Sequence, residues 1–278
     1  MDASRIVLAG GTGQIGRVLR EHFENQGGEV VVLSRAEGEG LTKWDGRSPG
    51  TWAQSLEGAD AVINLCGHSI VDRWTASNKR SYEESRLVPT EAIGEAVRKA
   101  HTPPRVWINA SAIGYYGDTG AGEVSEATRA GDGYLGALCE RWEDACLRHH
   151  TPQTRKVVMR LGVLLHRDAL FVRVTSLVAK LFLGAALGDG RQYVSWIHAN
   201  DLARMVEWCL YEPVSGPLNA CSPGPVTNGE YMAALRRLFD RPAVPPVPAP
   251  IVRLVIGLAG KEPSLLLTGQ RAVPEIAR

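Results

Sequence analysis

The chain has 278 residues, of which 31 are basic and 30 acidic, so its formal net charge is +1. Because the two signs are interspersed and nearly balanced, no extended field favours polyanions, and neither nucleic acid nor a membrane surface is an expected partner. No apolar run approaches the roughly 20 residues of a membrane helix, and no basic and apolar leader precedes the first strand pattern, so a cytoplasmic protein is the default expectation.

Apolar runs of strand length alternate with amphipathic stretches along the first part of the chain. The runs cover residues 6–9, 30–33, 61–65, 106–110 and 157–161, and the helices are predicted over 14–25, 76–99 and 134–149. Strands separated by helices in this way are typical of a parallel sheet covered on both faces. We therefore expect an α/β fold, with a Rossmann-like doubly wound parallel sheet over residues 1–165.

The pattern loosens beyond about residue 165. We expect residues 166–278 to form mostly a smaller C-terminal substrate lobe, with a segment of about 192–222 returning to the first domain. Thr227 and Glu230 have the spacing of a capping box and predict a helix that ends near Phe239. Five prolines between Arg241 and Pro250 predict an extended link after this helix.

A glycine-rich loop follows the first predicted strand and precedes the first predicted helix. Residues 10–16 satisfy both the GxGxxG and the GxxGxxG spacing. Glycines let the backbone turn tightly and approach a pyrophosphate, whose charge meets backbone N–H groups at a helix N-terminus. This context favours dinucleotide binding over the alternative, a glycine-rich turn without a ligand. The residues expected at that site are Gly10, Gly13, Gln14, Ile15 and Gly16.

The end of the second predicted strand bears on the choice of cofactor. A site that prefers NAD(H) places Asp or Glu there against the ribose hydroxyls, whereas this chain has Ser34 and Arg35. A hydroxyl and a guanidinium suit a 2′-phosphate, so NADP(H) is the predicted cofactor. The alternative is that Arg35 is a solvated residue after a strand.

Short motifs spread over nearly the whole chain resemble the atypical extended short-chain dehydrogenase/reductase group, the epimerase-like NAD(P)-binding proteins also described as nucleoside-diphosphate-sugar epimerase-like. The motifs are Gly10–Gly16, Asn64-Leu65-Cys66-Gly67, Arg73-Trp74, Ser85-Arg86, Ala110–Gly117, Trp142-Glu143, Gly190-Arg191-Gln192, Ser195–His198, Asp201-Leu202, Val226-Thr227-Asn228 and Gly269-Gln270-Arg271. Relatives of this group continue past the last motif into another helix, whereas this chain stops at Arg278. That difference leaves open whether the C-terminus is truncated.

The resemblance implies further cofactor contacts. Leu65 and Cys66 are expected on the adenine-ribose side, and Gly67 of the same turn is a further expected cofactor-binding residue. Arg86 is expected to reach the cofactor from the helix after the third large strand. For Arg86 the alternative is an ion pair on the helix surface with a nearby glutamate, Glu83, Glu84 or Glu91.

The catalytic apparatus of working short-chain dehydrogenases is present only in part. Such enzymes resemble one another in a Ser or Thr, a Tyr and a Lys four residues after the Tyr, which lowers the phenol pKa. Here Ser111 and Tyr134 fit the first two positions, but the third is Leu138. Tyr116 is an alternative acid, with the alternative that Tyr115 and Tyr116 only pack against the sheet.

Trp196 and His198 lie in a stretch that resembles the family's return from the lobe, and we expect them at the substrate cleft. The alternative for His198 is a hydrogen-bonded core residue, and Asp201 is expected to cap the helix that follows. The five cysteines form no CxxC pair and are interpreted as reduced thiols, and no metal site is expected.

These observations are compatible with two functions. The leading hypothesis is an NADP(H)-dependent oxidoreductase or epimerase-like enzyme that acts on a small polar substrate, with nucleotide sugars as one candidate class. The alternative is a non-catalytic NADP(H)-binding sensor or interaction protein, which Leu138 favours. Because extended members often dimerise through the helices after strands three and four, a homodimer is a further expectation by analogy.

Overall fold

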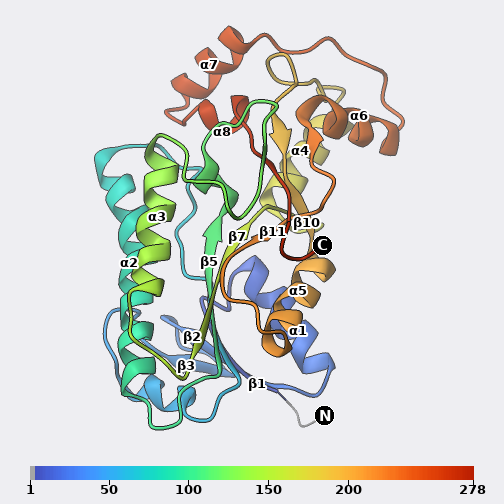
Figure 1. Ribbon diagram of the computed structural model, residues 1–278. Helices are drawn as coiled ribbons and strands as arrows, with labels where there is room; N and C mark the ends of the chain where they lie inside the picture. Colours follow the sequence, from blue (N-terminus) through green and yellow to red (C-terminus); the bar gives the residue numbers. More distant parts are fainter. Residues whose placement is uncertain (1–3) are drawn as a thin grey trace.

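The computed structural model describes residues 4–278, and its central feature is a seven-stranded parallel sheet in the order β11-β7-β5-β4-β1-β2-β3 (Figure 1). The expectation about a leader falls partly on residues 1–3, which lie outside the described residues. The strands are β1 (Arg5–Ala9), β2 (Glu29–Ser34), β3 (Leu41–Lys43), β4 (Ala61–Asn64), β5 (Val106–Ala112), β7 (Arg155–Leu161) and β11 (Gly216–Ala220).

The strand order reverses at β1, which pairs in parallel with β2 on one side and with β4 on the other. Val7, for example, lies opposite Val31 of β2 and Val62 of β4. Ligands of open α/β sheets bind at such a reversal, outside the carboxyl ends of the strands. The topology therefore predicts a ligand site at the loops that follow β1, β2 and β4.

Helices cover both faces of the sheet, as the continuous burial of its central strands requires. One face carries α1 (Gln14–Asn25) and α5 (Ala199–Tyr211), and the other carries α2 (Ala76–Lys99) and α3 (Tyr134–Leu147) together with the short 3-10 helix η1 (Thr51–Leu56) (Figure 1).

Alternate residues of each strand feed the two cores. Ile6 and Leu8 of β1 pack in the same core as Leu19 of α1, whereas Val7 packs in the opposite core with Ile93 of α2. Both predictions, the fold class and the covered parallel sheet, are confirmed, because only strands buried on both faces need such continuous apolar runs.

The remaining elements form a smaller cap at the top of Figure 1. It contains the helices α4 (Leu170–Lys180), α6 (Asn228–Leu238), α7 (Ala249–Leu258) and α8 (Ser264–Leu267), together with η2 (Ile113–Tyr116) and the short strands β6 (Glu123–Val124), β8 (Val163–Leu165), β9 (Tyr193–Val194), β10 (Trp196–His198), β12 (Val226–Thr227) and β13 (Arg271–Ala272). The segment 192–222 contributes β10 to this region, but it also supplies α5 and the edge strand β11 of the main sheet. The boundary near residue 165 stays a prediction.

Most of the helix ends predicted from capping residues agree with the structure. Thr227 and Glu230 form the predicted capping box, and α6 ends at Leu238. The prediction for α5 was wrong, because its N-cap is His198, whose Nδ1 accepts a hydrogen bond from the Asn200 N–H at 3.2 Å. Asp201 lies in the first turn, where its charge is favourable beside the helix dipole. In the part of the chain described, none of the helices is both long and apolar enough to cross a membrane.

Candidate functional site

A groove of about 940 Å³ lies at the carboxyl ends of β1, β2, β3 and β4, with α2 forming one of its walls. Its volume falls in the range of ligand pockets, roughly 300–1,000 Å³. The predicted cofactor residues that line it are Gly10, Gly13, Ser34, Arg35, Leu65, Cys66 and Gly67. The loops after β1, β2 and β4, three segments far apart in the sequence, therefore meet at the expected edge of the sheet.

The glycine loop is shaped for close approach of its backbone. Gly10 has a φ of +75°, and a Cβ there would lie 3.0 Å from the Leu65 carbonyl carbon. A Cβ on Gly16 would lie 2.4 Å from the Cα of Gly11, so only glycine allows α1 to begin this close to the loop. The N-cap of α1 is Gly13, which provides no side-chain cap. The N–H groups of the first turn are thus left to an external acceptor, and an anion suits them.

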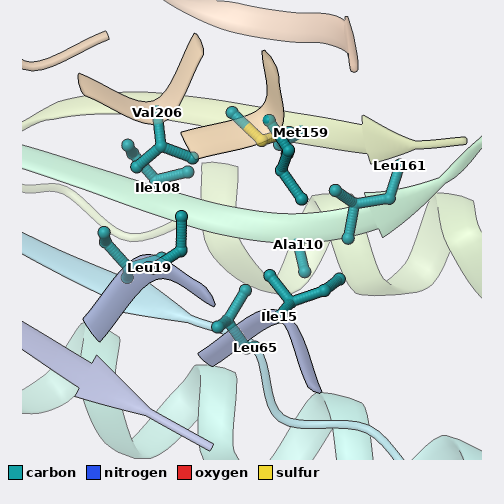
Figure 2. A pocket seen from close by; sticks show the side chains of 10 residues that line it. Ile15, Leu19, Leu65, Ile108, Ala110, Met159, Leu161 and Val206 are labelled. Carbon is teal, nitrogen blue, oxygen red and sulfur yellow. The ribbon is translucent and has the colours of Figure 1, made fainter. Parts of the chain in front are cut away.

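Three predicted residues of this motif lie at the start of α1 without bordering the groove. Gln14 Nε2 donates to the Asp168 carbonyl at 2.8 Å, which ties the helix to the loop between β8 and α4. Ile15 packs with Leu65 around a void of about 10 Å³ (Figure 2), whose wholly apolar lining offers no partner for a bound water. Ile15 and Gly16 therefore support the loop through packing, and any direct role in binding stays a prediction.

The end of β2 presents one hydroxyl and one cation. Ser34 is buried, and its Oγ accepts a hydrogen bond from the Ala36 N–H at 3.1 Å, which orders the turn after the strand. Arg35 is exposed, lines the groove, and makes no ion pair or hydrogen bond to another part of residues 4–278. Burial raises the pKa of the Cys66 thiol to about 12, and the nearby charge of Arg35 opposes this rise. Cys66 is therefore a neutral thiol in the groove wall.

One segment of the groove, the loop after β3, was not predicted from the sequence. Trp44, Asp45, Gly46 and Arg47 all line it. The three-residue strand β3 gave no apolar run to recognise, although the Asp-Gly dipeptide at 45–46 was an available turn signal.

Arg86 lies on α2 next to Gly67 of the groove wall, but it is not among the residues that line the groove, so its contact with the cofactor stays a prediction. Its guanidinium lies over the Trp142 ring at 5.1 Å, and a Cβ on Gly67 would lie 3.3 Å from its Cζ. Burial lowers the pKa of Arg86. Glu83 is paired instead with Arg141, so in the described residues Arg86 has no carboxylate partner and the ion-pair alternative was wrong.

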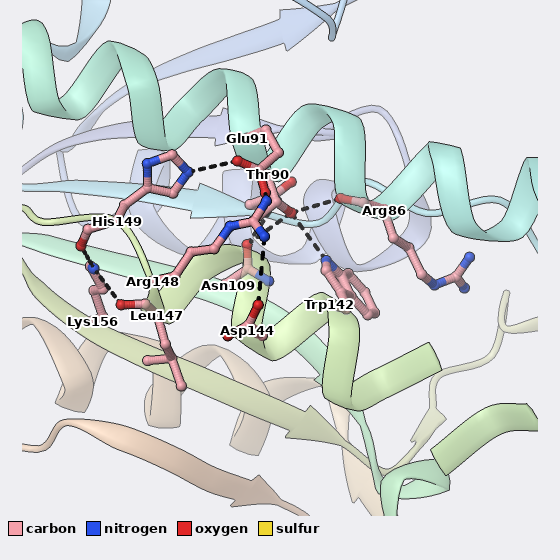
Figure 3. A network of polar contacts seen from close by, with 11 residues as sticks. Arg86, Thr90, Glu91, Asn109, Trp142, Asp144, Leu147, Arg148, His149 and Lys156 are labelled. Carbon is pink, nitrogen blue, oxygen red and sulfur yellow. Dashed lines mark hydrogen bonds and ion pairs between the residues drawn. The ribbon is translucent and has the colours of Figure 1, made fainter. Parts of the chain in front are cut away.

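The helix that carries Arg86 is held against α3 and the sheet by polar contacts (Figure 3). The Thr90 hydroxyl donates to the Arg86 carbonyl at 2.7 Å and accepts from Trp142 Nε1 at 3.2 Å. Glu91 pairs with both Arg148 and His149 of the segment after α3. These contacts fix the register of α2, and with it the position of Arg86.

Ser111 and Tyr116 belong to one buried polar network. Ser111 Oγ donates to Glu143 Oε1 at 2.6 Å, and Arg160 binds both oxygens of Glu143 at 2.9 Å. Tyr116 donates to Asn219 Oδ1 at 2.7 Å and accepts from Arg160 Nη1 at 2.9 Å. Burial raises the pKa of Tyr116 to about 12, so its phenol stays protonated near neutral pH. Both hydroxyls are engaged within the protein, and their catalytic roles remain predictions.

Tyr134 opens α3, and its hydroxyl donates to the Lys79 carbonyl at 3.0 Å. Burial raises its pKa, with the charge of Glu83 acting in the same direction. The Lys79 ammonium lies over the Tyr134 ring, 4.9 Å from its centre, in the geometry of a cation–π contact. Leu138, four residues on, is buried in the core. The lysine that would stabilise a phenolate is thus missing at its usual place.

Trp196 and His198 lie on β10, away from the groove lining. Trp196 Nε1 donates to the Gly224 carbonyl at 3.1 Å. His198 is exposed at the start of α5, so the alternative that it is a core histidine was wrong, while its place at a substrate cleft stays a prediction. All five cysteines are unpaired, and residues 4–278 contain no group of three or more His, Cys, Asp or Glu side chains placed to hold a metal ion.

Known proteins share this architecture and sequence. Residues 6–135 match the model of the NAD dependent epimerase/dehydratase family. The epimerase family protein ML0860 of Mycobacterium leprae is 38% identical over 277 residues, which cover 97% of this chain and 88% of the relative. This chain belongs to that epimerase family. The human epimerase family protein SDR39U1 is 33% identical over 276 residues, 98% of this chain and 92% of the relative.

Solved structures share the fold of this chain. A crystal structure of human SDR39U1 (isoform 2) with NADPH has a TM-score of 0.88 at 33% identity and covers 97% of this chain and 91% of that one. MoeE5 in complex with UDP-glucuronic acid and NAD has a TM-score of 0.74 at 18% identity, over 98% of this chain and 89% of that one, which is a likeness of fold alone. The chain is therefore an epimerase-family NAD(P)-binding protein with a Rossmann-like sheet.

Proposed function

We propose that this protein binds NADP(H) in the groove at the ends of β1 to β4. The observation that carries the proposal is Arg35, a groove-lining guanidinium without a partner in the described chain, at the position where a site for NAD(H) would place a carboxylate. The uncapped N-terminus of α1 and the close-packed glycine loop suit a pyrophosphate beside it. The human relative SDR39U1, whose crystal structure was obtained with NADPH, supports the same choice.

The bound dinucleotide would supply hydride chemistry, and the protein would position it. We propose an oxidoreductase or epimerase-like reaction on a small polar substrate, with nucleotide sugars as the first class to examine. The fold-level likeness to MoeE5, which was crystallised with UDP-glucuronic acid, is the reason for that choice. Ser111, Tyr116 and Tyr134 are the candidate proton-handling residues, and Trp196 and His198 are candidates for substrate contact.

A second candidate function is a non-catalytic NADP(H) sensor. It is favoured by the engaged hydroxyls of Ser111, Tyr116 and Tyr134 and by the buried Leu138, which stands where working short-chain dehydrogenases have the lysine that stabilises the phenolate. An unassisted phenol has a pKa of about 10, so only a small fraction ionises near neutral pH. A sensor needs the groove but not these groups.

Incubation with NADPH and a panel of nucleotide sugars and small carbonyl compounds separates the two functions. An oxidoreductase oxidises NADPH in the presence of at least one reducible compound, so the NADPH absorbance falls. An epimerase converts a sugar to its epimer and returns the cofactor to its starting state, so the sugar products are analysed as well. Calorimetric titration with NADPH accompanies the screen. Binding without any turnover would favour the sensor, and absence of binding would contradict both proposals.

The cofactor preference is tested with Arg35→Asp. Because hydrogen bonds to charged groups contribute about 1.5–3 kcal/mol, removal of the guanidinium is expected to weaken NADPH binding by roughly tenfold to somewhat over a hundredfold. The new carboxylate should also reverse the preference toward NADH. A variant whose ratio of NADPH to NADH affinity equals that of the unmodified chain would show that Arg35 does not bind the 2′-phosphate.

A further inference from the structure

A second guanidinium borders the groove beside Arg35. Arg47, in the loop after β3, is exposed and lines the same cavity. Parallel pairing aligns Ser34 of β2 with Lys43 of β3, and the Trp44 N–H donates to the Ser34 carbonyl at 3.1 Å. The loops that carry the two arginines therefore start side by side at the same edge of the sheet.

The loop that carries Arg47 is held in one conformation. Asp45 Oδ1 accepts hydrogen bonds from the N–H groups of Arg47 at 2.8 Å and Ser48 at 3.0 Å, and its Oδ2 accepts from Ser48 Oγ at 2.8 Å. Gly46, with a φ of +69°, allows the turn between them. A side chain that starts from an ordered backbone loses less freedom on binding a ligand than one on a mobile loop.

Aromatic packing anchors the same loop to the core. The buried Trp44 ring meets the Trp52 ring edge-on, with centroids 5.2 Å apart, and Trp52 Nε1 donates to the Ser48 carbonyl at 2.9 Å. The backbone at both ends of the Arg47 turn is thus fixed to buried side chains.

The charges around the groove leave Arg47 available. Lys43, the neighbouring cation of β3, is paired with Glu37 at 3.5 Å, whereas the guanidinium of Arg47 has neither an ion pair nor a hydrogen bond within residues 4–278. Asp45 also lines the groove, but three of its roughly four acceptor positions are used inside its own turn. Glu84, the other carboxylate of the lining, comes from the α2 wall rather than from the strand-end loops.

We infer that Arg47 is a second binding residue for the 2′-phosphate of the adenosine end, so that Arg35 and Arg47 together hold that phosphate. This inference rests on the proposed NADP(H) binding, and it assigns part of the specificity to a loop that the sequence motifs do not mark. Two planar guanidiniums can offer several N–H donors to the oxygens of the 2′-phosphate. The ribose hydroxyl that NAD(H) has in its place cannot accept these donors in the same way.

Calorimetric titrations of the whole chain test the inference without any need for turnover. The ligands are NADPH, NADH, 2′,5′-ADP and 5′-AMP, and the proteins are the unmodified chain, Arg47→Leu, Arg47→Lys and the matched control Arg98→Leu at the far end of α2. We expect Arg47→Leu to bind NADPH and 2′,5′-ADP about tenfold or more weakly, with NADH and 5′-AMP unchanged. Arg47→Lys should recover part of the loss, and Arg98→Leu should match the unmodified chain.

Other outcomes overturn the inference in distinguishable ways. If Arg47→Leu leaves the NADPH to NADH ratio unchanged while Arg35→Asp reduces it, NADP(H) binding stands and Arg47 has no part in it. If Arg47→Leu weakens all four ligands equally, the loop only shapes the adenosine pocket. If the unmodified chain shows no preference for the phosphorylated ligands, the proposed cofactor choice and the role of Arg47 both fall.

Discussion

Replacement of the buried carboxylate in Glu143→Leu is expected to lower the free energy of unfolding by about 3–5 kcal/mol. Glu143 and Arg160 are almost completely buried, with side-chain exposures of 7% and 2%, and two N–O contacts of 2.9 Å join them. Removing one partner leaves the other charge without compensation in the interior, and Ser111 also loses its acceptor. The cost therefore exceeds that of an ordinary lost hydrogen bond, about 1 kcal/mol.

A double-mutant cycle in urea, followed by tryptophan fluorescence and far-ultraviolet circular dichroism, measures this effect. The double variant Glu143→Leu with Arg160→Met should cost no more than either single change, because no buried charge is then left alone. The control is Glu83→Leu, which breaks a half-exposed pair with Arg141 and should cost less than about 1 kcal/mol. Additive single costs, or a loss for Glu143→Leu no larger than that of the control, would refute the reasoning.

The remaining predictions concern the tyrosines and Asp45. Because Leu138 provides no cation, Tyr134→Phe should leave cofactor affinity unchanged and reduce any turnover by less than the ~10²–10⁴-fold typical of a lost general acid–base group, whereas complete loss of turnover would contradict this. In contrast, Tyr116→Phe should lower the free energy of unfolding by about 1–3 kcal/mol in urea, because Asn219 loses its donor; an unchanged midpoint would count against the network. Hydrogen bonds from the Arg47 and Ser48 N–H groups lower the pKa of Asp45 from 3.8 to about 2, so its stabilising effect is present above pH 3.8 and is lost as the pH falls toward 2. Asp45→Asn should thus unfold at lower urea than the unmodified chain at pH 6, with a gap that narrows below pH 3.8, and a gap independent of pH would contradict the assignment.

The central strands could be predicted because burial on both faces demands continuous apolar runs. Ile6 to Ala9 and Val157 to Met159 form such runs, and the structure places them in the sheet. The edge strands β3 and β11 could not be predicted in this way. The first has three residues, one of them charged, and the second begins with Gly216 and Pro217, so neither shows the pattern of a doubly buried strand.

The residues of the candidate site also fall into two groups, those that could be predicted from the sequence and those that could not. Gly10 and Arg35 were predicted because their roles depend on local order, a loop or strand end beside a helix. Arg47 was missed, since its place in the groove depends on the pairing of β3 with β2 rather than on a local motif. The partner of Tyr116 was also beyond prediction, because Asn219 lies 103 residues further along the chain and meets it only through the packing of the folded protein.

The most direct test of the account is a pair of calorimetric titrations of the unmodified protein with NADPH and with NADH at one salt concentration. The groove-lining Arg35 leads us to expect NADPH to bind more tightly by roughly tenfold to somewhat over a hundredfold, the equivalent of one charge-assisted contact of about 1.5–3 kcal/mol. Equal affinities for the two dinucleotides would contradict the assignment of the β2 end as a 2′-phosphate site.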